Sequence, residues 1–111
     1  MKYSIFLQLK TGENNWTDMG QKHVISWETR DLIEASSGWF IINQDRVRYA
    51  SELIPMLQKG ILELTQDCEA YEYYEMVHGY GTIKRVLVFF NDLLEDCKQY
   101  PYAELHGEMI A

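Results

Sequence analysis

Hydrophobic and polar residues alternate over positions 2–10, "KYSIFLQLK". One face of this segment carries the apolar side chains Tyr3, Ile5, Leu7 and Leu9, and the other face is polar except for Phe6. A period of two with one apolar face predicts a half-buried strand. Turn-forming residues follow from Thr11, and positions 11–22 are polar apart from Trp16 and Met19. We therefore expect a mobile surface loop over 11–22.

The next segment leaves two interpretations open. "HVISW" at 23–27 is a candidate second strand. In one interpretation Ser26 or Thr29 caps a short helix that Gly38 ends in the left-handed conformation. In the other, 23–27 forms a hairpin with Trp39–Ile42. The segment "WFIIN" at 39–43 predicts a short strand in both.

From Ser51 the apolar residues recur every three or four positions, which predicts a helix. They are Leu53, Ile54, Leu57, Ile61 and Leu64. Ser51 is the expected N-cap, Glu52 suits the first turn, and Pro55 requires the helix to begin close before it. Gly60 destabilises a helix interior by about 0.8–1 kcal/mol relative to alanine. We infer that another element approaches closely there.

A short helical piece from Asp67 to Tyr74 precedes the most clearly patterned helix, which Thr82 is expected to cap. Its apolar stripe comprises Ile83, Val86, Leu87, Phe90, Leu93, Leu94 and Cys97. Val88 and Phe89 lie off this stripe and predict contact on a second side, with the sheet or with a second chain. Pro101 ends the helix, and the alternating "YAELHG" that follows predicts a C-terminal strand.

The order strand, helices, strand predicts an α+β fold in a single domain, 1–111. We expect a small, mainly antiparallel sheet that includes both terminal strands and packs against two or three helices. A length of 111 residues and an apolar fraction of 47% suffice for a core without disulfides or metal.

The net charge of −7, from 17 acidic and 10 basic residues, argues against direct binding to a nucleic-acid backbone or to an anionic membrane. No segment resembles a signal peptide or reaches the ~20 apolar residues of a membrane span. We therefore expect a cytoplasmic protein whose Cys68 and Cys97 are reduced, with Cys97 buried in its helix face.

Four segments together resemble a known group of proteins. They are "YSIFL", "HVISWETRDLIEASSGW", "LIPMLQKGILEL" and "GYGTIKRVLVFFNDLLEDCKQYPYAE". Their order is similar to a widespread family of small uncharacterised phage and bacterial proteins, which place a Gly-Trp-Gly-Thr/Ser turn before a Leu/Phe-rich helix. This chain departs from the pattern at "VISWE" and at Tyr80. The resemblance implies the same order of elements and a phage or bacterial origin, and it implies no activity.

The turn Gly79-Tyr80-Gly81-Thr82 precedes the last helix, with His78 beside it. Backbone N–H groups at a helix start can bind an anion, and Lys84 and Arg85 follow closely. The spacing of a phosphate-binding loop is missing, so a structural turn is favoured. A small-ligand or anion site at His78–Thr82, or an enzyme using it together with the 23–27 strand, remains the alternative function.

Candidate metal and catalytic residues are few. His23, His78 and His106 have no metal-ligand spacing. Glu104, His106 and Glu108 would share one face of the last strand, where a solvated surface is favoured over a divalent-ion site. No catalytic motif occurs. We assign no catalytic residue, metal or cofactor, and we incline against an enzyme.

The segment "CEAYEYYEMVHGY" is acidic and rich in tyrosine. Its candidate partner-binding residues are Glu69, Tyr71, Glu72, Tyr73, Tyr74 and Glu75. Tyrosine is enriched at interfaces, and carboxylates beside it suit an Arg- or Lys-bearing partner. The favoured function is therefore non-enzymatic interaction with a protein that has a basic surface, and self-association is also possible. The competing interpretation is that half of these rings pack on the helices.

Overall fold

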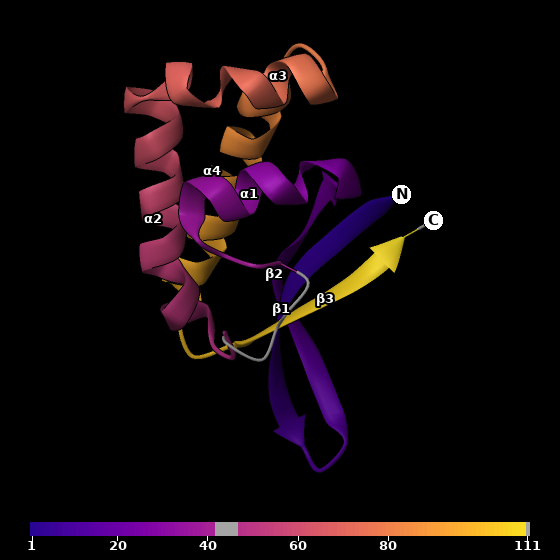
Figure 1. Cartoon of the computed structure of the whole chain (residues 1–111). Coiled ribbons are helices and arrows are strands. Elements are labelled where there is room, and N and C mark those ends of the chain that lie inside the picture. Colours follow the sequence, from indigo (N-terminus) through magenta and orange to yellow (C-terminus); the bar gives the residue numbers. More distant parts are fainter. Residues whose placement is uncertain (42–46, 111) are drawn as a thin grey trace.

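The computed structural model describes residues 1–41 and 47–110 (Figure 1). Its sheet has three strands in the order β2-β1-β3. They are β1 (Lys2–Gly12), β2 (Asn15–Ser26) and β3 (Glu104–Ile110). Both neighbours run antiparallel to β1, with Tyr3 opposite Ile25 on one side and opposite Met109 on the other. The predicted α+β fold, with the N- and C-terminal strands adjacent, is confirmed.

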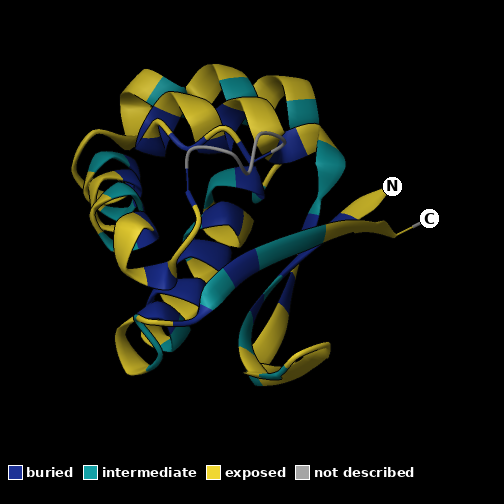
Figure 2. Cartoon of the chain, turned by 90° about the horizontal axis from the view of Figure 1, so that it is seen from below, coloured by how far each residue is buried: buried dark blue, intermediate teal, exposed yellow. Residues whose placement is uncertain are grey.

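The helical elements lie together on one side of this sheet (Figures 1 and 2). In the described residues they are η1 (Trp27–Thr29), α1 (Arg30–Ser37), α2 (Ala50–Gln66), η3 (Cys68–Tyr71), α3 (Glu72–His78) and α4 (Thr82–Gln99). η1 and η3 are single 3₁₀ turns, and η3 with α3 extends the short helical piece predicted from Asp67 as far as His78.

The surface loop predicted over 11–22 is wrong, because β2 begins at Asn15 and pairs with β1 almost from the turn. The distal hairpin, formed by the end of β1 and the beginning of β2, has solvent-exposed side chains on both faces. It extends away from the helices (Figures 1 and 2). A strand with two solvated faces has no apolar alternation. Polar pairs support it instead, such as Gln8 Nε2 donating to Asp18 Oδ1 at 2.7 Å.

Between the sheet and α2, the helix interpretation is confirmed and the hairpin interpretation is wrong. α1 ends at Gly38, whose φ of 77° is left-handed. Neither expected cap side chain bonds the helix start; the Thr29 hydroxyl donates back to the Ser26 carbonyl at 2.7 Å. Residues 39–41 are not a strand, and positions 42 and 43 of the predicted strand lie outside the described residues.

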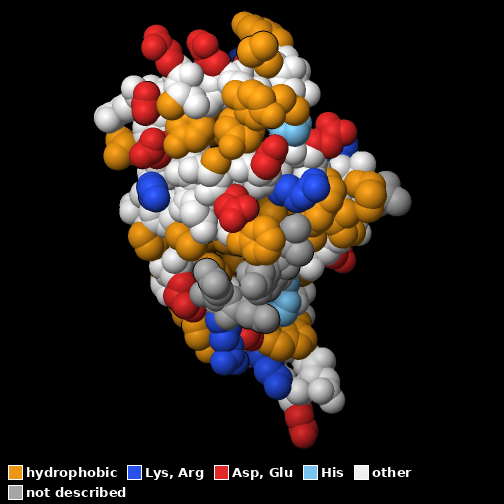
Figure 3. All heavy atoms as spheres, viewed as in Figure 1, with side chains coloured by type: hydrophobic (Ala, Val, Ile, Leu, Met, Phe, Trp, Pro, Cys, Tyr) orange, Lys and Arg blue, Asp and Glu red, His pale blue; other side chains and the backbone are white. Residues whose placement is uncertain are grey.

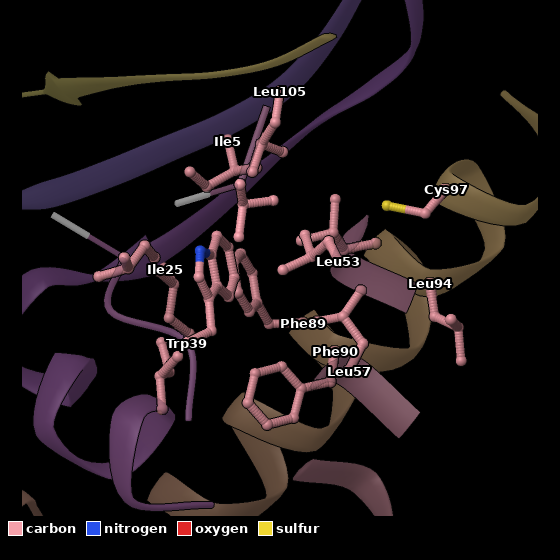
Figure 4. Packing of buried hydrophobic residues seen from close by; sticks show 14 of the residues in the cluster. Ile5, Ile25, Trp39, Leu53, Leu57, Phe89, Phe90, Leu94, Cys97 and Leu105 are labelled. Atoms are coloured by element: carbon pink, nitrogen blue, oxygen red, sulfur yellow. The ribbon is translucent and has the colours of Figure 1, made fainter. Parts of the chain in front are cut away.

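The core lies between the sheet and the helices (Figure 4). Trp39 is 1% exposed and stacks on Phe89, with ring centroids 6.3 Å apart. Phe89, one of the two apolar residues predicted to lie off the α4 stripe, therefore packs within this chain. Its neighbour Val88 stays 52% exposed.

α2 and α4 pack closely at Gly60. A Cβ atom there would lie 2.5 Å from Cε2 of Phe90 and 3.0 Å from Cβ of Ser37. The predicted close approach is confirmed. The helix start differs from expectation, because Tyr49 rather than Ser51 is the N-cap, and its N–H donates to Glu52 Oε1 at 3.0 Å.

Candidate functional site

The turn between α3 and α4 contains two glycines in the positive-φ region, Gly79 (105°) and Gly81 (89°). The expectation that Thr82 caps α4 is wrong. Gly81 is the N-cap, and Thr82 is fully buried with its hydroxyl donating to the Gly79 carbonyl at 2.6 Å. The cap is supplied from α3, because the Glu75 carboxylate accepts hydrogen bonds from Gly81 N at 3.1 Å and from Ile83 N at 2.9 Å.

This contact changes the ionisation of Glu75. Burial raises the pKa of the carboxyl, but hydrogen bonds from the N–H groups of Ile83, Gly81 and Thr82, and the charge of Arg85, outweigh it and lower the pKa below its ordinary value. The backbone groups that an anion would use already bind a carboxylate. The start of α4 in this conformation therefore offers no open anion site.

His78 connects α3 to α1. Its Nε2 lies 3.0 Å from both carboxylate oxygens of Asp31, and its ring stacks on Tyr74 at 6.4 Å. The side chain is only 13% exposed. This histidine is thus occupied in holding two helices together.

A groove of about 560 Å³ lies where η3, α3 and the first turns of α4 meet. We call it the α3–α4 groove; its lining residues are Cys68, Glu72, Glu75, Met76, Tyr80, Ile83, Lys84 and Leu87. No residue of α3 is fully buried. Met76 is 85% exposed and Tyr80 is 97% exposed. Figure 3 shows hydrophobic side chains gathered at this end of the molecule with acidic side chains beside them.

The predicted acidic tyrosine segment divides into two sets. Tyr71 and Tyr74 are half-buried against the core, and the Tyr71 hydroxyl donates to Glu63 at 3.2 Å. Burial, and then this hydrogen bond, raise the pKa of Tyr71. Tyr73 is 66% exposed and, like Glu69 and Glu72, faces solvent.

The sequence interpretation missed Met76, Cys68, Ile83 and Leu87 as groove residues. One signal was present: Met76-Val77 follows an acidic stretch in a segment too short to bury both side chains. Because Ile83 and Leu87 belong to the apolar stripe of α4, they were predicted to be core residues. They lie at the border of the core and are only half-buried.

A second groove, of about 550 Å³, separates the open edge of β2 from α4. The predicted 23–27 strand lies on one side of this groove and Lys84 and Arg85 lie on the other. His78 is not among the lining residues. Asp96 of α4 contacts two residues that line this groove. Its carboxylate accepts a hydrogen bond from Gln21 N at 3.0 Å and lies 2.6 Å from Nε2 of the buried His23. No sequence pattern indicated this contact between β2 and α4.

Glu104, His106 and Glu108 share the outer face of β3, as their pairing with alternate residues of β1 requires. Glu104 pairs with Arg48 at 3.0 Å and Glu108 with Lys22 at 3.5 Å. The His106 ring stacks on that of Phe6. Across residues 1–41 and 47–110, no cluster of three candidate ligands is arranged to hold a metal ion.

Comparison with known proteins found no matching family model, no matching curated protein and no matching solved structure. Within the described chain, no helix combines the length and the apolar character needed to cross a bilayer.

Proposed function

We propose that this chain is a non-enzymatic protein-interaction module, cytoplasmic and of phage or bacterial origin, that binds a partner with a basic surface. The partner would contact the α3–α4 groove and the exposed side chains beside it. The observation that carries the proposal is the exposure of Tyr80 and Met76, 97% and 85%, at the rim of a groove with apolar walls.

Such exposure needs an explanation, because neither side chain contributes to the core. Single exposed apolar residues are ordinary, but a contiguous patch at a groove is typical of an interaction site. Tyr73 and Val77, 66% and 53% exposed, extend the patch along α3. Tyrosine and methionine are enriched in the contact surfaces of proteins.

The charges favour a basic partner. Glu69 and Glu72 are exposed, and within the described residues neither forms an ion pair. A partner arginine or lysine could reach these carboxylates while an apolar side chain enters the groove. Glu75 does not contribute a free carboxylate, because it caps α4.

The test compares a double variant with a single-residue control, and both leave the core intact. The first is Met76→Ser with Tyr80→Ser. The control is Tyr102→Ser, which removes a tyrosine that is 57% exposed in a turn outside the groove. Proteins captured from a bacterial lysate are identified, and the affinity of each purified partner is measured by calorimetry. We expect the first variant to bind at least about tenfold more weakly, and the control to bind normally.

Charge is tested separately by the double variant Glu69→Lys with Glu72→Lys. It should lower the affinity for the same partner and reduce the salt dependence of binding. A partner that binds all variants equally would remove the support for this surface. The alternative, a small-ligand or anion site at His78–Thr82, predicts that phosphate or a nucleotide raises the melting temperature. It also requires Glu75 to leave the helix start.

A further inference from the structure

The groove between β2 and α4 differs in charge from the rest of the molecule. We call it the β2–α4 groove, and its cationic residues are Lys2, Lys22, Lys84 and Arg85. Asp92 is the one carboxylate among its lining residues. The chain as a whole has 10 basic and 17 acidic residues. Four cations around one groove are therefore a local reversal of the overall charge.

Two of these cations have no intramolecular counter-ion. Within the described residues, neither Lys2 nor Lys84 forms an ion pair, and both are exposed. Lys22 directs its Nζ across the outer face of the sheet, where it lies 3.5 Å from Glu108 of β3 and 5.2 Å from the centre of the Phe6 ring, so its charge does not point into the groove. The groove thus has unneutralised positive charge.

The wall opposite α4 is the open edge of a strand. β2 ends the strand order β2-β1-β3, so no described strand pairs with its outer edge. Trp27 N donates to Met1 O at 3.0 Å, which directs the backbone of residue 27 toward β1. Orientation alternates along an antiparallel strand, so Val24 and Ser26 direct their N–H and C=O groups away from β1.

These outward groups face the groove. Val24 and Ser26 are among its lining residues, and Gln21 N, slightly earlier in β2, already bonds Asp96 of α4. The apolar surface consists of Val24 and Val88, which are 46% and 52% exposed, together with Phe89. A strand edge, an apolar wall and flanking cations occur side by side.

We propose that the β2–α4 groove binds an extended, acidic segment of a partner protein, which adds to the sheet as a strand beside β2. Its backbone would pair with Val24 and Ser26. Alternate side chains would face Val88 and the cations, as in other recognition by strand addition. This site shares only Lys84 with the α3–α4 groove and selects a partner of the opposite charge.

The charges disfavour a second copy of this chain as the occupant. Pairing two β2 edges would bring two copies of this cation-lined groove together, and like charges in contact oppose association. An acidic segment has the complementary charge.

The probe is a short labelled peptide in which valine alternates with glutamate, and its control has lysine in place of glutamate. Binding is measured by fluorescence anisotropy. The test variant is Lys2→Glu, because Lys2 lines the β2–α4 groove, forms no ion pair within the described residues and does not line the α3–α4 groove. The matched control is Lys59→Glu, an equal charge change at an exposed site outside the groove. We expect about tenfold weaker binding or more for the test variant only.

Amide hydrogen exchange identifies the binding mode. The bound peptide should slow exchange at Val24 and Ser26 and leave Ile25, which faces β1, nearly unchanged. The proposal is overturned if the acidic probe does not bind at millimolar concentration, if both charge variants lose affinity equally, or if protection appears elsewhere. Dimerisation in light scattering with protection at β2 would also overturn it and would identify a second copy as the occupant.

Discussion

The carboxylate of Glu75 should contribute measurably to stability, although it lies in a helix with no fully buried residue. It accepts backbone hydrogen bonds from Gly81 N at 3.1 Å and from Ile83 N at 2.9 Å, and these N–H groups have no partner within α4. Losing a capping side chain costs about 0.5–2 kcal/mol, and a negative charge at a helix start adds about 0.3–1 kcal/mol. We expect Glu75→Ala to lower the free energy of unfolding by about 1–2 kcal/mol.

Glu75→Gln separates the charge from the hydrogen bonds. The amide oxygen still accepts, so we expect a smaller loss at pH 7, about 0.5–1 kcal/mol. Glu72→Gln is the control, because Glu72 lies in the same helix and is exposed, whereas the carboxylate bonded to the α4 start is that of Glu75. Urea unfolding followed by circular dichroism measures all three variants.

The pH dependence gives an independent check. The pKa of Glu75 is lowered in the folded state, so its contribution is complete above the unfolded pKa of about 4.3 and is lost as the pH falls through the folded value. The stability difference between wild type and Glu75→Gln should therefore shrink below about pH 4. A difference that is absent at pH 7, or that grows in acid, would refute the capping role.

Three further predictions concern the core and the thiols. Gly60→Ala should destabilise the protein by about 1–2 kcal/mol in urea unfolding despite its better helix propensity, because the added methyl group meets the fully buried Phe90, and Phe90→Leu should reduce that loss. Asp96→Ala should cost about 2–3 kcal/mol in the same assay, since it leaves a buried histidine without its partner, and stability equal to wild type would contradict this. Cys68 is exposed, whereas burial raises the pKa of Cys97 to about 12, so a thiol reagent should modify only Cys68 until the protein unfolds.

Sequence periodicity predicted the elements that bury one face. β1 and α4 each place a regular apolar stripe against the core, and that burial creates the pattern by which they are recognised. The distal part of β2 has no such face, because Asn15–Lys22 has solvent on both sides. It is a strand because its backbone pairs with that of β1, and such pairing cannot be predicted from the pattern of polar and apolar side chains.

The site was predictable in place but not in its contacts. Composition indicated the acidic tyrosine segment and the glycine turn. It did not show that Glu75 would turn back to cap α4, because that depends on the positive φ of Gly79 and Gly81. Asp96 with His23 is a still stronger example, since the two residues lie 73 positions apart and meet only when α4 packs beside β2.

The position of β1 in the middle of the sheet also determines when the sheet can be completed. β1 and β2 form a local hairpin, whereas β3 is synthesised only after all the helices that the structure describes. Until then one edge of β1 has unpaired N–H and C=O groups, and such an edge is a template for pairing with other chains. Long-range pairing of this kind slows folding and leaves the nascent chain open to aggregation. β3 therefore protects the edge of β1 by pairing with it. We expect aggregation of the nascent chain to be most favoured between the synthesis of β1 and that of β3.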